Sequence, residues 1–318
     1  MDFQRSWREV AFMRQSSTAY APGSVGNVGP GLDILGLAIA GCGDEASFTL
    51  RDPRGIVIDD AGHPDLPTDP ARHATAIAAN AVFARAGYRG GASMRVTKGL
   101  PLSGGQGGSA ASAIAGAVAA NHLLDAGLDT AALLACALEA ESAVAGRHAD
   151  NLAPSLLGGL VLVRSLDPID AIRLPLPTGL LVVLVHPQQQ LQTRDSRAVL
   201  PENIPRELAL RQAANIAAMV AGACLNDVAL FGRALDDRIA EPARAALLPG
   251  FIAAKRAALA GGALGCSISG AGPTAFALVD DQTVGERVAS GMAAAYATAG
   301  LHATTRIAEV DVRGATVR

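Results

Sequence analysis

A run of small residues at positions 100–121, LPLSGGQGGSAASAIAGAVAAN, constrains the fold more than any other part of the chain. Four glycines and three serines fall between residues 103 and 112, and an alanine-rich stretch follows directly. Glycine permits a positive φ and close backbone approach, and the first amides of a helix are unpaired at the positive end of its dipole. The pattern therefore suits a phosphate cradle, or else a structural turn before a closely packed helix.

The length of 318 residues suits two domains, which we place at residues 1–170 and 171–318. Prolines punctuate the chain at this boundary, at positions 168, 175 and 177. Half of the residues are apolar and only 3% are aromatic, so small side chains must fill most of the core.

Charge and cysteine usage narrow the class of protein. A net charge of −3 gives no basic excess for a nucleic acid or an anionic membrane. The four cysteines are far apart in sequence and form no CxxC pair, which indicates free thiols in a reducing compartment. Residues 1–15 lack the apolar core of a signal peptide, and apolar runs such as LLVVLV at 180–185 are too short to span a bilayer. These features predict a cytoplasmic protein without a membrane or nucleic-acid partner.

Apolar periodicity predicts an α+β fold, since strands and helices follow one another without a strict βαβ alternation. Helices are expected at residues 73–87, 110–124, 130–144, 207–225, 227–238, 251–260 and 284–300. Strands are expected at 36–50, 56–60, 92–101, 158–165, 179–187 and 302–312, with a strand–turn–strand unit at 266–280. The run at 179–187 is continuously apolar, which predicts a strand buried on both faces. Residues 1–15 are expected to be irregular, and residues 19–25 to be short and rich in turns.

Two further glycine-rich segments accompany the first, APGSVGNVGPGLDILGLAI at 21–39 and SISGAGPTAFALV at 267–279. The segment at 103–112 matches neither a Walker A loop nor a Rossmann fingerprint. Three such segments in this order resemble the GHMP kinase superfamily, named for galactokinase and the homoserine, mevalonate and phosphomevalonate kinases. The resemblance implies a ribosomal protein S5 domain 2-like N-terminal domain, a ferredoxin-like C-terminal domain, and the use of ATP and Mg²⁺.

Within the superfamily, the chain is similar to the homoserine kinase family. The similarity rests on GNVGPGLDILGLAI, RHADNLAPSLLGGLVLV, TRDSRAVLP and IAEPARAALLPGF. It implies phosphorylation of the L-homoserine hydroxyl to O-phospho-L-homoserine in threonine biosynthesis, by a homodimer. A zwitterionic substrate needs a cation for its carboxylate and an anion for its ammonium. The residues expected to bind it are Asn27, Asp33, His148, Asn151, Arg197 and Arg244.

The resemblance also implies the nucleotide and metal contacts. The expected ATP-binding residues are Pro101, Ser103, Gly104, Gly105, Gln106, Gly107, Gly108, Ser109 and Ala110. Ser109 and Glu141 are expected to hold Mg²⁺, with Glu139 as the rival of Glu141, because two residues that are two apart on a helix diverge by about 200°. Catalysis is assigned to Asn151, Ser109 and Arg197, without a general base. Asp150 is expected to orient its neighbours.

The chain departs from the family at several positions. Gln106 and Gly108 stand where the family has leucine and serine, and Leu32 stands where it has phenylalanine. The stretch DPARHATA at 69–76 lacks the usual asparagine, so the adenine pocket stays unassigned. Two alternatives therefore remain open: a kinase for another small, amino acid-like hydroxyl compound, and a catalytically weak ligand sensor.

Overall fold

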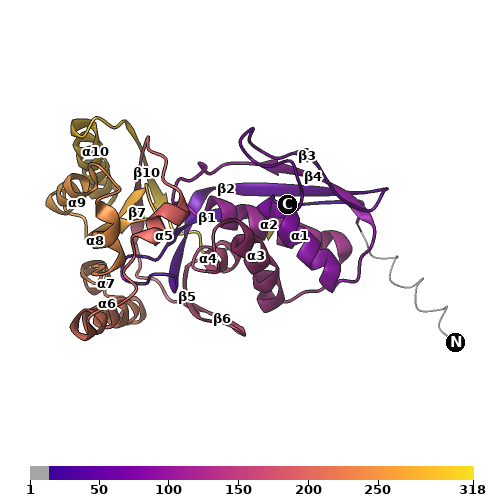
Figure 1. Ribbon diagram of the computed structural model, residues 1–318. Helices are drawn as coiled ribbons and strands as arrows, with labels where there is room; N and C mark the ends of the chain where they lie inside the picture. Colours follow the sequence, from indigo (N-terminus) through magenta and orange to yellow (C-terminus); the bar gives the residue numbers. More distant parts are fainter. Residues whose placement is uncertain (1–13) are drawn as a thin grey trace.

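The computed structural model describes residues 14–318, so most of the predicted irregular segment at residues 1–15 lies outside the described residues. The chain forms two β-sheets with helices packed around them (Figure 1). Most predicted elements are present, and most of these match within two residues at each end, among them α3 (Thr130–Val144), β7 (Leu181–Pro187) and α9 (Phe251–Ala260).

The first sheet contains seven strands in the order β11-β1-β2-β4-β3, with β5 pairing to β2 and β6 pairing to β5. Its strands are β1 (Ser16–Gly26), β2 (Leu35–Arg51), β3 (Gly55–Asp60), β4 (Gly91–Thr97), β5 (Leu160–Leu166), β6 (Ile169–Leu174) and β11 (Thr316–Val317). The helices α1 (Ala74–Arg85), α2 (Gly108–Leu124), α3 and α4 (Leu152–Leu157) pack together against this sheet. Alanine fills much of their shared core, as the composition predicts.

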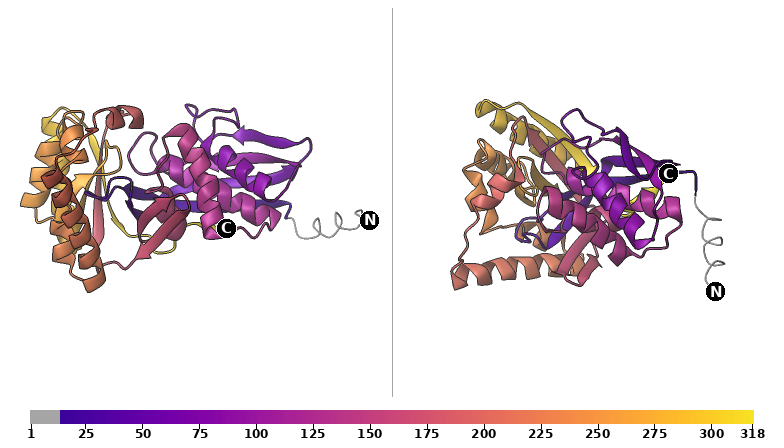
Figure 2. Two further views of the ribbon diagram at one scale, coloured as in Figure 1. Left: turned by 60° about the horizontal axis from the view of Figure 1, so that its bottom comes forward. Right: turned by 45° about the vertical axis from the view of Figure 1, so that its right-hand side comes forward.

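The second sheet contains four antiparallel strands in the order β10-β7-β9-β8. Its strands besides β7 are β8 (Gly265–Ile268), β9 (Ala275–Val279) and β10 (Ala303–Glu309). The helices of this part are α5 (Thr193–Ala198), α6 (Arg206–Leu225), α7 (Val228–Arg233), α8 (Ala240–Ala245), α9 and α10 (Gln282–Thr298). As Figure 2 shows, α6 is a long rod along the outer side of this half of the molecule.

A shared core joins the two sheets. Val182 and Leu184 of β7 pack with Val25 and Leu37 of the first sheet, while Val183 on the other face of β7 packs against α9 and α10. The prediction that this strand is buried on both faces is therefore confirmed. Because the two sheets share apolar contacts, the surfaces between them are held at a fixed separation.

Several sequence expectations were wrong. Residues 19–25 form most of β1, which pairs with β2 along its length and changes register between Pro22 and Gly23. The helix predicted at 227–238 ends at Arg233. The punctuated stretch at 165–178 contains β6, so the predicted division between residues 170 and 171 falls inside that strand, and β11 returns to the first sheet. The short helices α4, α5 and α8 were not predicted.

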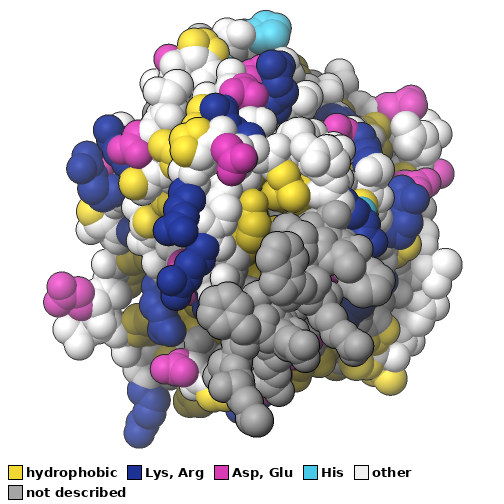
Figure 3. Space-filling model, turned by 90° about the vertical axis from the view of Figure 1, so that its right-hand side faces the viewer, with side chains coloured by type: hydrophobic (Ala, Val, Ile, Leu, Met, Phe, Trp, Pro, Cys, Tyr) yellow, Lys and Arg dark blue, Asp and Glu magenta, His cyan; other side chains and the backbone are white. Residues whose placement is uncertain are grey.

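At the end of the molecule away from the second sheet, positive and negative side chains lie interspersed (Figure 3). Within residues 14–318, α6 alone is long and apolar enough to cross a membrane, with a mean hydropathy of 1.4 over its best window. Core helices of soluble proteins meet the same criterion, so one such helix is weak evidence for a membrane segment.

Candidate active site

A cleft of about 570 Å³ lies where the two halves of the molecule meet, and all three glycine-rich segments contribute to its lining. Of the predicted site residues, those that line it are Asn27, Asp33, Pro101, Ser103, Gly104, Gly105, Gly107, Gly108, Ser109, Glu141, His148, Asn151, Arg197 and Arg244. Two predicted residues do not: the Gln106 amide donates to Thr274, and Ala110 is fully buried. The fold thus gathers nearly the whole predicted set around one cavity.

The glycine loop, residues 103–108, forms one wall of this cleft. Its backbone takes positive φ at Ser103, Gly105 and Gly107, and the last of these precedes the first turn of α2. The third glycine-rich segment supports it from behind, because the Ser269 hydroxyl donates to the Gly105 carbonyl over 2.6 Å. A Cβ at position 105 would lie 2.6 Å from the Ser269 carbonyl oxygen. The loop is therefore fixed by backbone contacts, with the α2 amides at its end available to an anion.

A buried ion pair lies under the same loop. Lys98 and Asp44 are paired, with side chains 7% and 0% exposed. The Lys98 ammonium also donates to the Gly108 carbonyl over 3.2 Å and to the Ser112 hydroxyl over 3.0 Å. The sequence reasoning missed this group, although a lysine three residues before Pro101 was visible in TKGLP. It fixes the last peptide of the loop and places a positive charge beside it.

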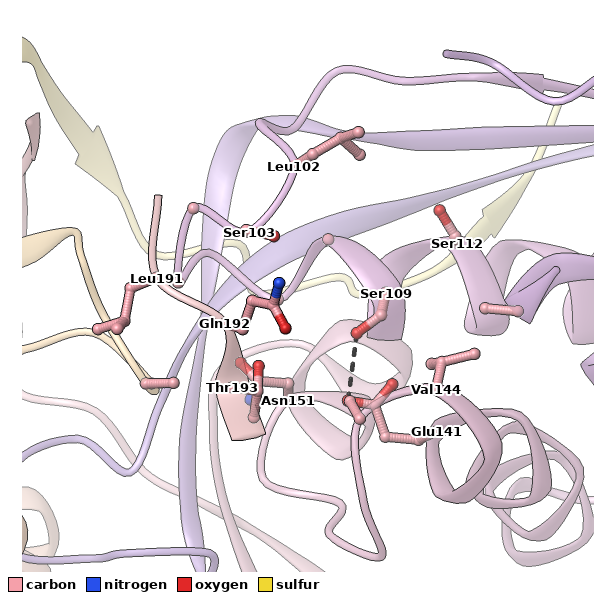
Figure 4. A pocket seen from close by; sticks show the side chains of 18 of the residues that line it. Leu102, Ser103, Ser109, Ser112, Glu141, Val144, Asn151, Leu191, Gln192 and Thr193 are labelled. Atoms are coloured by element: carbon pink, nitrogen blue, oxygen red, sulfur yellow. Dashed lines mark hydrogen bonds between the residues drawn. The ribbon is translucent and has the colours of Figure 1, made fainter. Parts of the chain in front are cut away.

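Ser109 and Glu141 meet across the floor of the cleft (Figure 4). The Ser109 hydroxyl donates to Glu141 Oε1 over 3.2 Å, while Glu141 Oε2 is buried without a hydrogen-bond partner. Burial raises the pKa of Glu141 to about 7, although His148 and Ser109 oppose the shift. Glu139 instead pairs with Arg85 at the surface, so it is Glu141 that lies beside Ser109.

These two side chains fit the predicted metal. A hydroxyl and a buried carboxylate are oxygen ligands, and Mg²⁺ usually takes few protein ligands because it keeps several waters. The free Oε2 of Glu141 offers such a ligand atom. No cluster of three or more His, Cys, Asp or Glu side chains with metal-binding geometry occurs within the described residues, 14–318.

The segment His148–Asn151 closes the cleft beside the first glycine-rich segment. His148 Nδ1 lies 3.3 Å from Asp150 Oδ1 and 3.8 Å from Glu141 Oε1. Burial alone would lower the pKa of His148, but the carboxylates of Asp150 and Glu141 outweigh it and raise that pKa. Asp150 also accepts the backbone N–H of Asn27 over 2.9 Å, and Asn151 accepts the Ser24 hydroxyl over 3.0 Å. Asp150 thus contacts both Asn27 and His148, and it also lines the cleft, so its role in orienting its neighbours stays a prediction.

Asn27 and Asp33 stand in a tightly turned loop after β1. Asn27, Val28, Gly29 and Asp33 all have positive φ, which is costly for a β-branched residue such as valine. The Asn27 amide holds this loop, because it donates to the Gly270 carbonyl over 2.8 Å and accepts the Asp33 N–H over 3.0 Å. The structure therefore gives Asn27 a structural task besides its place in the cleft lining.

Two arginines face this loop from α5 and α8. Arg197 makes a bidentate pair with Asp33, with N–O distances of 2.6 and 3.1 Å. Arg244 is 3% exposed and donates only to the carbonyls of Ser196 and Gly270, over 3.1 and 3.0 Å. No carboxylate within residues 14–318 pairs with Arg244. Burial and the nearby charge of Arg197 lower its pKa.

The cleft is also lined by residues that come before the glycine loop in the sequence. Among them are Asp65, Leu66, Pro67, Arg72, His73 and Leu102. His73 is 2% exposed and its Nε2 lies 3.2 Å from the Ala61 carbonyl oxygen. The adenine pocket was left unassigned from the sequence, because the stretch at 69–76 lacks the asparagine that is usual in the family.

Comparison with known proteins points to the same family as the sequence motifs. The family model described as GHMP kinases N terminal domain matches residues 72–159, and the model described as GHMP kinases C terminal matches residues 215–298. The chain is 41% identical to the homoserine kinase of Chlorobium phaeobacteroides over 292 residues, which cover 87% of this chain and 91% of that protein. It is 40% identical to the homoserine kinase of Arabidopsis thaliana over 310 residues, which cover 94% and 84% of the two chains.

A solved structure agrees in three dimensions. The crystal structure of homoserine kinase from Cytophaga hutchinsonii matches with a TM-score of 0.91 at 39% identity, covering 96% of this chain and 98% of that one. The predicted resemblance and the predicted two-domain α+β fold are thus confirmed. The roles of the individual site residues stay predictions, although the structure now gives the position and contacts of each residue. The chain belongs to the homoserine kinase family of the GHMP kinases.

Proposed function

We propose that the protein transfers a phosphoryl group from ATP to the hydroxyl of L-homoserine, giving ADP and O-phospho-L-homoserine for threonine biosynthesis. The similarity to homoserine kinases over most of the chain supports this function. The observation that carries it is Arg244, a buried cation next to Arg197 that has no carboxylate partner in the described chain. Such a group is stabilised by a bound anion, and the substrate carboxylate would supply it.

The wall of the cleft that is formed by the glycine loop suits the triphosphate of ATP. The amides of the glycine loop and of the first turn of α2 would hold phosphate oxygens, with the Lys98 charge beside them. Ser109 and Glu141 would hold Mg²⁺, which when bound neutralises charge on the phosphates and orients them. Glu141 must be ionised for this task, and a bound divalent cation would favour the ionised form against the burial that raises its pKa.

Orientation of the hydroxyl falls to the His148–Asn151 segment. The Asn151 amide is held by Ser24, and a carboxamide has no basic group with which to take a proton. The neighbouring carboxylates raise the pKa of His148 and so favour its charged form, which cannot accept a proton. Phosphoryl transfer proceeds through a loose transition state, so positioning and charge neutralisation provide most of the acceleration. We therefore assign no general base.

The test is release of ADP from the purified protein with Mg·ATP, with L-homoserine, L-serine, L-threonine and mevalonate as acceptors. We expect turnover with L-homoserine, and a phosphomonoester product by ³¹P NMR. Turnover with another acceptor instead would contradict the substrate. Binding of ATP without turnover on any acceptor would contradict the enzymatic function and favour a ligand sensor. Calorimetry with L-homoserine, with and without nucleotide, separates the last two outcomes.

Two further properties stay proposals: a homodimer, which follows the family resemblance, and a cytoplasmic location, which follows the cysteine usage. The apolar outer residues of α6, including Leu210 and Leu225 at 64% and 72% exposed, are compatible with a covered surface. Sedimentation of the purified protein over a range of concentrations tests the dimer directly.

A further inference from the structure

One buried side chain outside the cleft contacts both the loop of residues 27–33 and the turn before α8. These two segments carry or precede residues that are predicted to bind the substrate. Gln212 of α6 is 6% exposed, and its amide nitrogen donates to the Pro30 carbonyl over 2.8 Å and to Asp237 Oδ1 over 2.9 Å. Its amide oxygen accepts the Arg238 N–H over 2.8 Å. Both N–H donors of the amide are therefore used, and each reaches a different segment.

The first of these segments is the loop of residues 27–33. Its positive φ values make the conformation costly, so contacts from elsewhere must hold it. The contacts on the cleft side come from Asp150 and Gly270, through Asn27, and from Arg197, through Asp33. On the side facing α6, the tether is the bond from Gln212 to Pro30. This bond lies three residues from Asp33 and does not touch the cleft.

The second segment is the turn that begins α8. Asp237 is 5% exposed and accepts the N–H groups of Ile239, Ala240 and Glu241, over 2.8, 3.0 and 2.9 Å. It thereby fixes the start of the short helix that carries Arg244 in its last turn. Gln212 holds this aspartate and the adjacent Arg238 amide.

We propose that Gln212 is a positioning residue that sets the spacing between the Asn27–Asp33 loop and the Arg244 helix, and so tunes affinity for the amino-acid end of the substrate. This inference rests on the proposed function for the identity of the substrate. Its geometric part does not, because the two tethered segments belong to the structure whatever the ligand. Removing the tether leaves the Pro30 carbonyl unpaired in a buried place and the Arg238 N–H unpaired in a partly buried one, so both segments shift to regain partners.

The test compares Gln212→Met with a matched variant one turn along the same helix. Methionine keeps the volume of glutamine and removes all three hydrogen bonds. The control is Asn215→Leu, because Asn215 donates to the Asp236 carbonyl over 2.7 Å but does not reach the Pro30 loop. We expect Gln212→Met to raise the KM for L-homoserine about tenfold and to leave the KM for ATP within about twofold. Asn215→Leu should leave both within about twofold.

A second variant guards against misfolding. Gln212→Glu keeps the acceptor for Arg238, loses both donors and places a carboxylate against Asp237, so its KM for L-homoserine should rise at least as much. Equal effects of Gln212→Met and Asn215→Leu, or a rise in the KM for ATP of the same size, would overturn the inference. A change in kcat alone would do so too.

Hydrogen exchange separates this inference from the proposed function. In Gln212→Met, amides in residues 27–33 and 239–244 should exchange faster than in the wild type and in Asn215→Leu. If the wild-type protein does not act on L-homoserine, the proposed function fails while the exchange result still judges the role of Gln212. Unchanged exchange in both segments would refute that role.

Discussion

The two walls of the cleft are built by different means. The glycine loop presents backbone groups, held by positive φ at Ser103, Gly105 and Gly107 and by support from the third glycine-rich segment. The opposite wall presents charged side chains, Arg197 and Arg244, which come from two short helices. A Cβ at Gly104, Gly105 or Gly107 of the backbone wall would collide with a neighbouring atom, whereas a side-chain wall is sensitive to charge more than to shape. Substitutions in the two walls should therefore have different effects.

The backbone wall should give the largest effect. Gly105→Val adds side-chain atoms within contact distance of the Ser269 and Gly272 carbonyls, at a φ of 71°. We expect kcat/KM for ATP to fall at least about 100-fold, because the loop must move. Gly127→Val is the control: it has a similar φ of 63° but no neighbour within 4 Å. It should cost stability, about 1–2 kcal/mol, without changing kcat/KM. Equal kinetic effects would refute a backbone-built wall.

Glu141, on the floor between the two walls, should make the stability of the protein depend on pH. Burial raises the pKa of Glu141 from 4.5 to about 7, so without metal its neutral form favours the folded state. This stability is complete below about pH 4.5 and is lost as pH rises through 7. The loss should amount to ~2–3 kcal/mol, with His148, Asp150 and Arg197 facing the group.

Urea unfolding in EDTA at pH 5 and pH 8 measures this loss. Glu141→Gln should remove it, since an amide does not ionise, while Glu139→Gln should keep it because Glu139 is half-exposed. A wild-type protein that is equally stable at both pH values would contradict the buried position of the carboxyl.

Substitution of Arg244 in the charged wall should make the protein less able to distinguish between substrates. We expect Arg244→Met to raise the KM for L-homoserine about 30-fold, from the loss of a charge-assisted contact worth ~2 kcal/mol. The same variant should no longer distinguish L-homoserine from an analogue with a hydroxymethyl group in place of the carboxylate. Arg238→Met is the control, since Arg238 is half-exposed and pairs with Asp236. If Arg244→Met still distinguishes the two acceptors, Arg244 is not the carboxylate contact.

The smallest effect should come from the ion pair in the same wall. Asp33 and Arg197 have side chains 37% and 33% exposed, so solvent screens their attraction. Asp33→Asn keeps a side chain that tolerates positive φ and removes only the charge. Thermal unfolding should show a loss of at most ~1 kcal/mol. A loss above about 2 kcal/mol would mean that this pair supports the fold and is not a solvated part of the substrate wall.

Sequence reasoning predicted the long elements well and the short ones poorly. A buried strand such as β7 appears as a continuous apolar run, and helices of ten or more residues show a periodic apolar pattern. The helices α4, α5 and α8 have six residues each, too few for a period. No residue of β6 is fully buried, so the strand shows no alternation of buried and exposed positions. β1 contains a proline and two glycines that suggested turns.

The site was predicted where side chains could be matched to a motif. Geometry separated Glu141 from Glu139, which spacing alone could not do, because the direction of each side chain depends on how α3 packs. Lys98 and Gln212 were not predicted, because their partners lie 54 and 182 residues away in sequence. Contacts of this kind arise from the tertiary fold and leave no local pattern.

The helix behind the glycine loop has a consequence for how this sequence can change. Seven alanines of α2 are wholly buried, and a Cβ on Gly116 would lie 2.5 Å from the Thr75 carbonyl. Alanine and glycine lose no side-chain rotamer freedom on folding, so this helix becomes rigid at little entropic cost. Almost every single-nucleotide replacement here enlarges a side chain, and overpacking costs about 1–3 kcal/mol. Variation along α2 should therefore be confined to exchanges among the smallest residues, even at positions that never meet a ligand.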